Sequence, residues 1–158
     1  MSGTSATGEA RHANPDAGTM IRRWFDEVWN QGKEEAIDQM LAKNAKMWGI
    51  NRPDVSSTGS QEFKKFYHTM RTTFSDIKIT LDQVVQEGDT AFTRWTVTGT
   101  HSGEGPGSPA TRNQLTFKGM SACRVQDGMI VEGWNVWDQI GMARQLGVLS
   151  GHAATLFP

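Results

Sequence analysis

The sequence predicts an α+β fold in which helices come first and strands follow. In the first half of the chain, apolar residues recur at helical spacing in three segments. In the second half, apolar and polar residues alternate along segments rich in Thr, Val, Trp and Phe, as is typical of strands. Helices grouped apart from a run of strands favour an α+β architecture over alternating α/β units.

The first predicted helix begins after Asp16, a favoured N-cap residue, and ends at Asn30-Gln31 before Gly32. A second, shorter helix is expected from about Lys33 to Ala42. Met47 to Ile50 is expected to be extended, and a polar loop follows to Ser60. A third helix ends near Phe74, and Thr58 with Gln61 has the spacing of a capping box.

The strands are predicted as a meander whose turns are marked by Gly88-Asp89 and Asp127-Gly128. A Gly/Pro-rich loop at 102–113 interrupts it, and a last short helix ends at Gly147. We expect a cone-shaped, curved antiparallel sheet packed against the N-terminal helices, enclosing an apolar pocket. The predicted strands are Ile77 to Glu87, Thr90 to His101, Gln114 to Val125 and Met129 to Trp137.

Length and composition indicate one domain of 158 residues. We expect a disordered leader at 1–15, the domain at 16–148 and a tail at 149–158. The net charge of -1 does not favour nucleic acid or an anionic membrane as a partner, and no apolar run approaches the roughly 20 residues of a spanning helix. The single cysteine, Cys123, excludes an intrachain disulfide and suits the cytoplasm.

A series of short motifs occurs in a fixed order, and together they resemble the SnoaL-like polyketide cyclases, within the nuclear-transport-factor-two-like fold. The resemblance runs from about Met20 to Gly147. The motifs are Trp29-Asn30-Gln31-Gly32, Phe74-Ser75-Asp76, Glu87-Gly88-Asp89, Trp95 to Gly103, Arg124 to Ile130, and Asp138 to Gly141 with Gln145-Leu146-Gly147.

This resemblance implies a deep apolar cavity, a homodimer, and no metal or organic cofactor. The name-giving members close a ring of an aromatic polyketide by intramolecular aldol condensation. An aspartate on the last strand serves them as the acid and base.

The chain departs from that pattern at its polar positions. The aspartate position holds Asn135, the histidine helper falls on Ser121 and a glutamine falls on Gly119. A polar residue near the pocket floor falls on Met47 or Trp48. Because an asparagine amide does not exchange protons near neutral pH, Asn135 can orient or polarise a carbonyl but cannot act as a general base.

Strand alternation from the Asp127-Gly128 turn places Gly119 and Ser121 on one face with Asn135, and we expect Gly119 to lie opposite Asn135. That face is expected to line the pocket. Among the six tryptophans, Trp95 and Trp137, with Trp48, are candidates to stack on a flat ligand; the alternative is ordinary core packing.

Two further residues are candidates for proton transfer. His101 ends the strand that holds Trp95, and histidine is the natural acid or base near pH 7. The alternative for His101 is a strand-end residue bonded to the long loop. Asp138 is either a carboxylate at the pocket or the N-cap of the last helix. The histidines show no metal-ligand spacing.

Three functions remain open on these observations. The first is an enzyme that cyclises, isomerises or hydrates a small apolar polyketide-like carbonyl compound, with His101 or Asp138 moving protons and Asn135 orienting the substrate. The second is a non-catalytic small-molecule-binding protein of the same fold. The third is a protein-interaction module whose sheet is the working surface.

Overall fold

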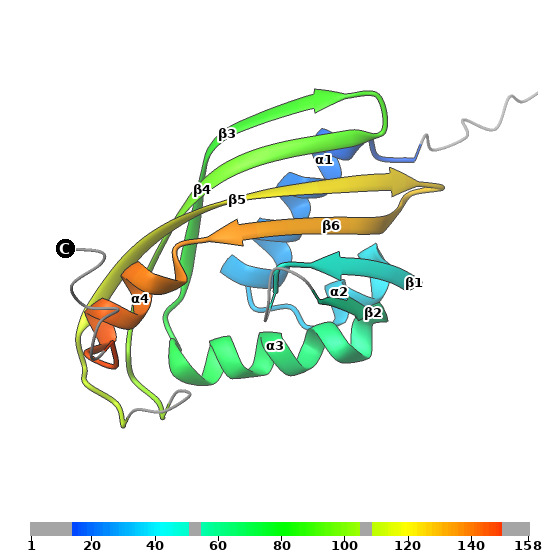
Figure 1. The fold of residues 1–158 in the computed structure, drawn as a ribbon. Coiled ribbons are helices and arrows are strands. Elements are labelled where there is room, and N and C mark those ends of the chain that lie inside the picture. The colour runs from blue at the N-terminus through cyan, green and yellow to red at the C-terminus, as the bar shows by residue number, and fades with distance from the viewer. Residues whose placement is uncertain (1–13, 51–54, 105–108, 150–158) are drawn as a thin grey trace, which may run out of the picture.

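A computed structural model describes residues 14–50, 55–104 and 109–149. The described chain forms one strongly curved, open sheet with helices gathered on its inner side, as Figure 1 shows. This confirms the predicted α+β class. The predicted leader and tail fall almost wholly outside the described residues.

The sheet has six strands in the order β2-β1-β6-β5-β4-β3. All neighbours are antiparallel except β1 and β6, which run parallel. The bounds are β1 Leu41–Trp48, β2 Ser56–Thr58, β3 Lys78–Glu87, β4 Thr90–Thr100, β5 Gln114–Gln126 and β6 Met129–Trp137.

The predicted first helix consists of two kinds of helix. Asp16 caps α1 (Ala17–Arg23) by accepting a hydrogen bond from Thr19 N at 2.7 Å, as predicted. The chain then widens into a π-helix, η1 (Trp24–Asn30), in which Gln31 N donates to Asp26 O at 2.8 Å. This turn buries Trp24, Phe25 and Trp29 together beneath the sheet.

The second predicted helix is shorter than expected, because α2 spans Glu35–Met40 and β1 begins at once. Of the expected extended piece at Met47 to Ile50, only Met47 and Trp48 belong to this longer strand, which ends at Trp48. In β1 the side chains of Ala45 and Met47 are buried while Lys46 is exposed. Met47 pairs with Gly133 of β6 in parallel, whereas the four strands of the predicted meander are antiparallel as expected.

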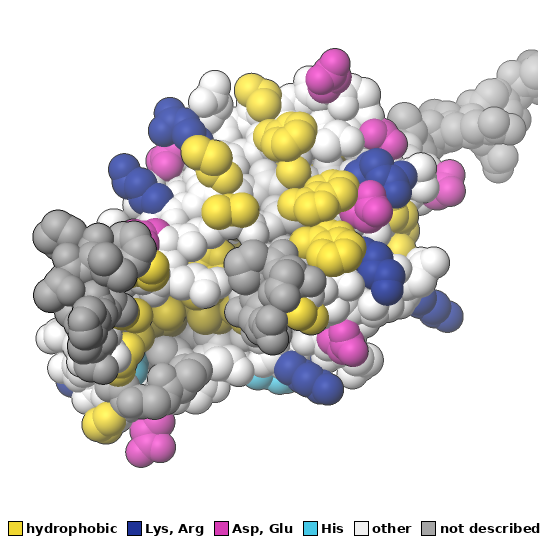
Figure 2. All heavy atoms as spheres, viewed as in Figure 1, with side chains coloured by type: hydrophobic (Ala, Val, Ile, Leu, Met, Phe, Trp, Pro, Cys, Tyr) yellow, Lys and Arg dark blue, Asp and Glu magenta, His cyan; other side chains and the backbone are white. Residues whose placement is uncertain are grey.

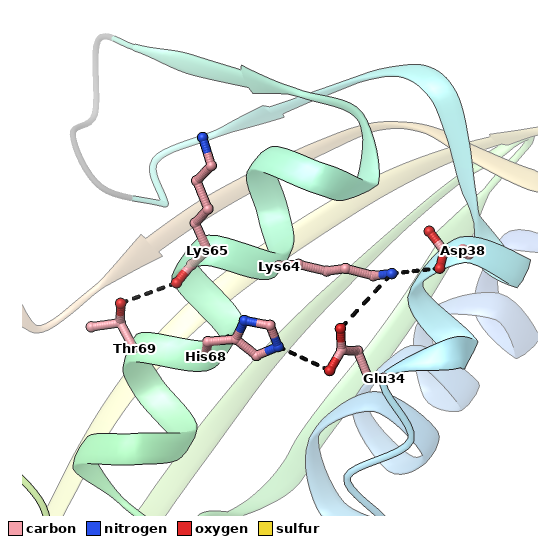
Figure 3. Close-up of polar contacts among 6 residues, drawn as sticks. All are labelled: Glu34, Asp38, Lys64, Lys65, His68 and Thr69. Atoms are coloured by element: carbon pink, nitrogen blue, oxygen red, sulfur yellow. Dashed lines mark hydrogen bonds and ion pairs between the residues drawn. The ribbon is translucent and has the colours of Figure 1, made fainter.

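Helix α3 (Gly59–Thr73) runs along the open side of the sheet, and polar side chains tie it to α2 (Figure 3). Lys64 Nζ lies 2.5 Å from Asp38 Oδ2 and 3.9 Å from Glu34 Oε1, while His68 Nε2 lies 2.9 Å from Glu34 Oε2. The cap of α3 differs from the prediction, because Glu62 rather than Gln61 accepts from Thr58 N, at 2.6 Å.

Strands β5 and β6 meet at the predicted turn, where Asp127 and Gly128 have φ of 51° and 75°. Next to it, Arg124 pairs with Glu132 but Val125 pairs with Ile130, so Val131 forms a bulge. The extra residue moves the partners along the strand. The pairing of Gln126 with Met129 at the turn and this one-residue shift together bring Gly119 opposite Trp137 and not Asn135, so the predicted register is wrong.

Ser121, rather than Gly119, is the residue opposite Asn135. The predicted shared face of β5 and β6 is nevertheless observed.

Helix α4 (Gln139–Leu146) follows β6 and ends at Gly147, whose φ is 74°. In the part of the chain that the structure describes, no helix is long and apolar enough to cross a membrane.

Candidate functional site

An apolar cavity lies between η1, α3 and the inner face of the sheet, with a volume of about 60 Å³. Asn135 supplies the amide among its lining side chains, and none of the described lining residues titrates near neutral pH. The lining comprises Trp24, Phe25, Trp29, Met47, Ile50, Phe63, Phe66, Met70, Ile77, Ile79, Trp95, Val97, Phe117, Asn135 and Trp137.

The aromatic rings of the lining pack on one another and hold each other in place. The ring centroids of Trp24 and Phe63 are 4.9 Å apart, and those of Phe117 and Trp137 are 5.5 Å apart. The remaining ring contacts are tilted or edge-on, which is the favoured geometry for aromatic pairs. Such walls suit a flat, conjugated molecule better than a charged one.

A chain of hydrogen bonds supports the polar corner of the cavity. Trp95 Nε1 donates to Ser121 Oγ at 2.9 Å, and Ser121 Oγ donates to Asn135 Oδ1 at 2.8 Å. Asn135 Nδ2 in turn donates to the Trp48 carbonyl at 3.1 Å. Because an indole N–H can only donate and the Trp48 carbonyl can only accept, the direction of every bond in the chain is fixed.

The orientation of the Asn135 amide follows from this chain. Its oxygen must face Ser121 and its nitrogen must face the Trp48 carbonyl. One N–H of the amide and one lone pair of its oxygen are not used by these bonds. The amide can therefore donate one hydrogen bond to a ligand oxygen in the cavity.

Two glycines on the sheet let side chains lie flat against it. A Cβ at Gly119 would lie 2.4 Å from the Trp95 ring, and one at Gly133 would lie 2.7 Å from Met47 Sδ. Gly119 thus seats the indole of Trp95, and Gly133 makes room for Met47. Both seated side chains line the cavity.

His101 is completely buried at the end of β4 but does not line the cavity. Its Nδ1 accepts from Thr111 N at 3.2 Å and lies 3.0 Å from Thr111 Oγ1. These bonds place the proton of the neutral ring on Nε2, which has no hydrogen-bond partner in the described part of the chain. The ring packs beside Phe74, 6.1 Å between centroids. This is the arrangement of a histidine that anchors the long loop.

Asp138 is exposed and caps α4, accepting from Gly141 N at 2.7 Å. It lies outside the cavity lining. The structure therefore brings Met47, Trp95, Asn135 and Trp137 to the cavity. Ser121 stands behind Asn135, Gly119 lies beneath Trp95, and Trp48 contributes its carbonyl; His101 and Asp138 lie elsewhere.

Sequence reasoning did not name the aromatic residues that the helices and β5 contribute to the cavity. Trp24, Trp29 and Phe63 lie on the apolar faces of their helices, where a core residue and a lining residue have the same spacing. The unusual aromatic content of those faces was the available signal. Phe117 on β5 was visible only as a residue two positions before Gly119.

Cys123 offers no reactive thiol, because burial raises its pKa to about 12. Within residues 14–50, 55–104 and 109–149, no cluster of three or more His, Cys, Asp or Glu side chains could hold a metal ion.

Comparison with known proteins places these features in a family context. The model of the SnoaL-like polyketide cyclase family matches residues 19–146. The search of curated proteins gave no match.

Solved structures share this fold. IdmH from Streptomyces antibioticus is 29% identical, with a TM-score of 0.71 over 82% of this chain and 96% of that one. TsrD from Streptomyces laurentii is 26% identical, with a TM-score of 0.72 over 89% and 100%. A protein with a ketosteroid isomerase-like fold from Catenulispora acidiphila, 12% identical, has a TM-score of 0.67 over 82% and 93%, which supports the fold alone.

Proposed function

Because the chain belongs to the SnoaL-like polyketide cyclase family, we propose that it binds a small, neutral, polyketide-like carbonyl compound and promotes its cyclisation. The observation that carries this proposal is the aromatic cavity with the oriented amide of Asn135 at its wall. A flat conjugated substrate would stack on the aromatic rings. Its carbonyl oxygen would accept the free N–H of Asn135.

In this proposal the protein acts mainly by holding the substrate folded. Confinement of two reacting carbons at contact distance removes much of the entropy cost of ring closure. The enol carbon of one carbonyl unit bonds to the carbon of a second carbonyl. The enol proton passes to the new alkoxide oxygen within the substrate or through water, so the product is an isomer of the substrate.

Asn135 replaces the usual carboxylate and would polarise the attacked carbonyl rather than remove a proton. The location of His101 and Asp138 outside the cavity lining gives less support to isomerisation or hydration, which both need a proton delivered to carbon. We therefore place cyclisation first among the reactions that the fold family suggests.

Non-catalytic binding of the same kind of compound is the second candidate. It is favoured by the absence of titratable side chains from the described lining and by the two bonds that already occupy half of the hydrogen-bonding capacity of Asn135. Binding and turnover therefore have to be measured separately.

The test uses conjugated aromatic polyketones, with tryptophan quenching for binding and mass-resolved chromatography for conversion. If the proposal holds, a ligand that binds is converted to an isomer of equal mass, and Asn135→Leu lowers turnover by about tenfold or more. Asn44→Leu, an exposed position on β1, is the matched control and should leave turnover unchanged. Binding without conversion across the series would support the second candidate instead.

We also propose that a second copy of the chain covers the outer face of the sheet. Figure 2 shows hydrophobic side chains gathered on this face. Contiguous exposed apolar side chains of this kind are typical of protein–protein interfaces. The patch comprises Val85, Phe92, Met120, Trp134 and Val136, which are between 38% and 75% exposed.

A further inference from the structure

A second apolar space, a groove between α3 and α4, opens beside the cavity. It has a volume of about 450 Å³. Four residues line both spaces: Ile50, Phe66, Met70 and Trp137. The apolar lining of the cavity therefore continues into that of the groove through these four side chains.

The groove is lined mainly by apolar side chains, and its polar lining residues are Thr69, Thr73 and Gln139. Thr73 donates its hydroxyl to Thr69 O at 2.8 Å, and Thr69 donates to Lys65 O at 3.0 Å (Figure 3). Both hydroxyl groups are thus satisfied by the backbone of α3. No charged side chain is among the described residues that line the groove.

Apolar side chains extend the groove along α4 to the end of the described chain. Ile140 is 39% exposed and Val148 is 38% exposed, and both line the groove. Phe66 and Trp137, at the junction with the cavity, are only partly buried. A ligand that followed this line would remove apolar surface from water over its whole length.

From this continuity we infer that the ligand is elongated, with a flat carbonyl-bearing head in the cavity and a neutral, flexible apolar chain in the groove. The inference rests on the proposed function, because it assumes that the cavity takes the head. It adds the substrate class: a compact polycyclic ketone would use only the cavity, whereas an aryl ketone with a long hydrocarbon chain would use both spaces. The uncharged linings of both spaces select against a chain that ends in a carboxylate.

Prodan and Laurdan test the inference directly, because both are dimethylaminonaphthyl ketones and they differ only in the length of the acyl chain. Their fluorescence reports transfer into an apolar site, and the titrations are made below the concentrations at which Laurdan self-associates. Each methylene removed from water improves affinity about fourfold. We expect Laurdan to bind the full-length chain at least about thirtyfold more tightly than Prodan.

Ala143→Phe on α4 would fill the groove without touching the cavity, since Ala143 lines only the groove. It should bring Laurdan affinity close to that of Prodan and leave Prodan affinity unchanged. Arg144→Phe, on an exposed neighbouring position outside both linings, adds the same bulk and should preserve the difference. Ile140→Glu at the partly exposed rim is a second variant with the same expected loss for Laurdan.

The inference would be overturned if the two ketones bound with equal affinity, or if the advantage of Laurdan survived both groove variants. In either case, binding of Prodan would still support the cavity as the site for the ketone head. A failure of both ketones to bind would overturn the proposed function as well. In the full chain, Leu156→Ser with Phe157→Ser tests whether the C-terminal segment fills the groove. If the advantage of Laurdan appeared only in that variant, the groove would belong to the chain itself and the inference would fail.

Discussion

Ser121 and Asn135 lie opposite each other on β5 and β6, and the Ser121 hydroxyl donates to Asn135 Oδ1 at 2.8 Å. The same hydroxyl accepts from Trp95 Nε1 at 2.9 Å. One serine therefore fixes both the aromatic wall and the amide of the cavity. Ser121 can therefore stand at the position of the family's histidine helper without leaving the Trp95 N–H or the Asn135 oxygen unsatisfied.

Replacement of Ser121 by alanine should destabilise the protein by about 1–3 kcal/mol, because it leaves the Trp95 N–H and the Asn135 oxygen without their partner. Chemical denaturation followed by far-UV circular dichroism measures the change. Thr80→Ala on exposed β3 is the control and should cost much less. A Ser121→Ala variant as stable as the parent would show that the chain of bonds contributes little.

Asn135→Asp should introduce a carboxyl group with a raised pKa. The group would be surrounded by aromatic side chains and would face the Trp48 carbonyl, 3.1 Å from the present amide nitrogen, and both features disfavour its charged form. The folded state would then hold a proton that the unfolded state loses near pH 4. Stability of the variant should therefore fall as pH rises from about 4 to the raised pKa.

Thermal unfolding at a series of pH values checks this sign. The exposed control Asn44→Asp should show no such fall. A variant whose stability is independent of pH across that window would place Asn135 in a more polar setting than the structure indicates. Where the parent is inactive, turnover by Asn135→Asp that depends on pH would indicate that the carboxyl group restores proton transfer.

The sequence was sufficient to predict the fold class, the helix boundary at Asp16 and the Asp127-Gly128 turn, because each depends on local chemistry. It was insufficient for the pairing of β1 with β6, which joins segments far apart in the chain. The bulge at Val131 was equally hidden. An extra residue in one strand leaves no local signal but changes every partner beyond it.

For the candidate site, the sequence identified the face of β5 and β6 that carries Ser121 and Asn135. It did not reveal that hydrogen bonds orient the amide, since that depends on Trp95 crossing over Gly119. The π-helical turn that gathers Trp24 and Trp29 was also not predictable from a spacing that fits an ordinary α-helix. His101 bonds to the long loop and Asp138 caps α4. The sequence left each of these placements open as the alternative to a role in proton transfer.

Gly119→Ala should be more damaging than Gly133→Ala, although both add one methyl group to the inner face. At Gly119 the new Cβ would meet the Trp95 ring at 2.4 Å, and the ring is held by its bond to Ser121. At Gly133 it would meet the flexible thioether of Met47. We expect about 1–3 kcal/mol for Gly119→Ala and less for Gly133→Ala, measured by urea denaturation; equal costs would contradict the rigid seat for Trp95.

Asp76 links the start of β3 to the end of β4. Hydrogen bonds from Thr100 N at 2.6 Å and Thr100 Oγ1 at 2.8 Å hold the pKa of this carboxyl below its usual value. A depressed pKa contributes stability that is complete above the unfolded pKa of about 4 and is lost as pH falls through the folded value. Asp76→Asn should therefore reduce the loss of stability below about pH 4, as followed by acid titration of circular dichroism; an acid transition identical to that of the parent would contradict this role of Asp76.

The outer face of the sheet supplies the last prediction. Met120 and Val136 are cross-strand partners, and they are 64% and 75% exposed. If a second copy covers this face, the full chain should sediment as a dimer, and Val136→Lys should convert it to a folded monomer because a lysine ammonium would be buried without a partner. Gln61→Lys on exposed α3 adds the same charge away from the patch and should leave the dimer intact. Sedimentation of the parent as a monomer at all concentrations would refute the dimer, and a Val136→Lys dimer would move the interface elsewhere.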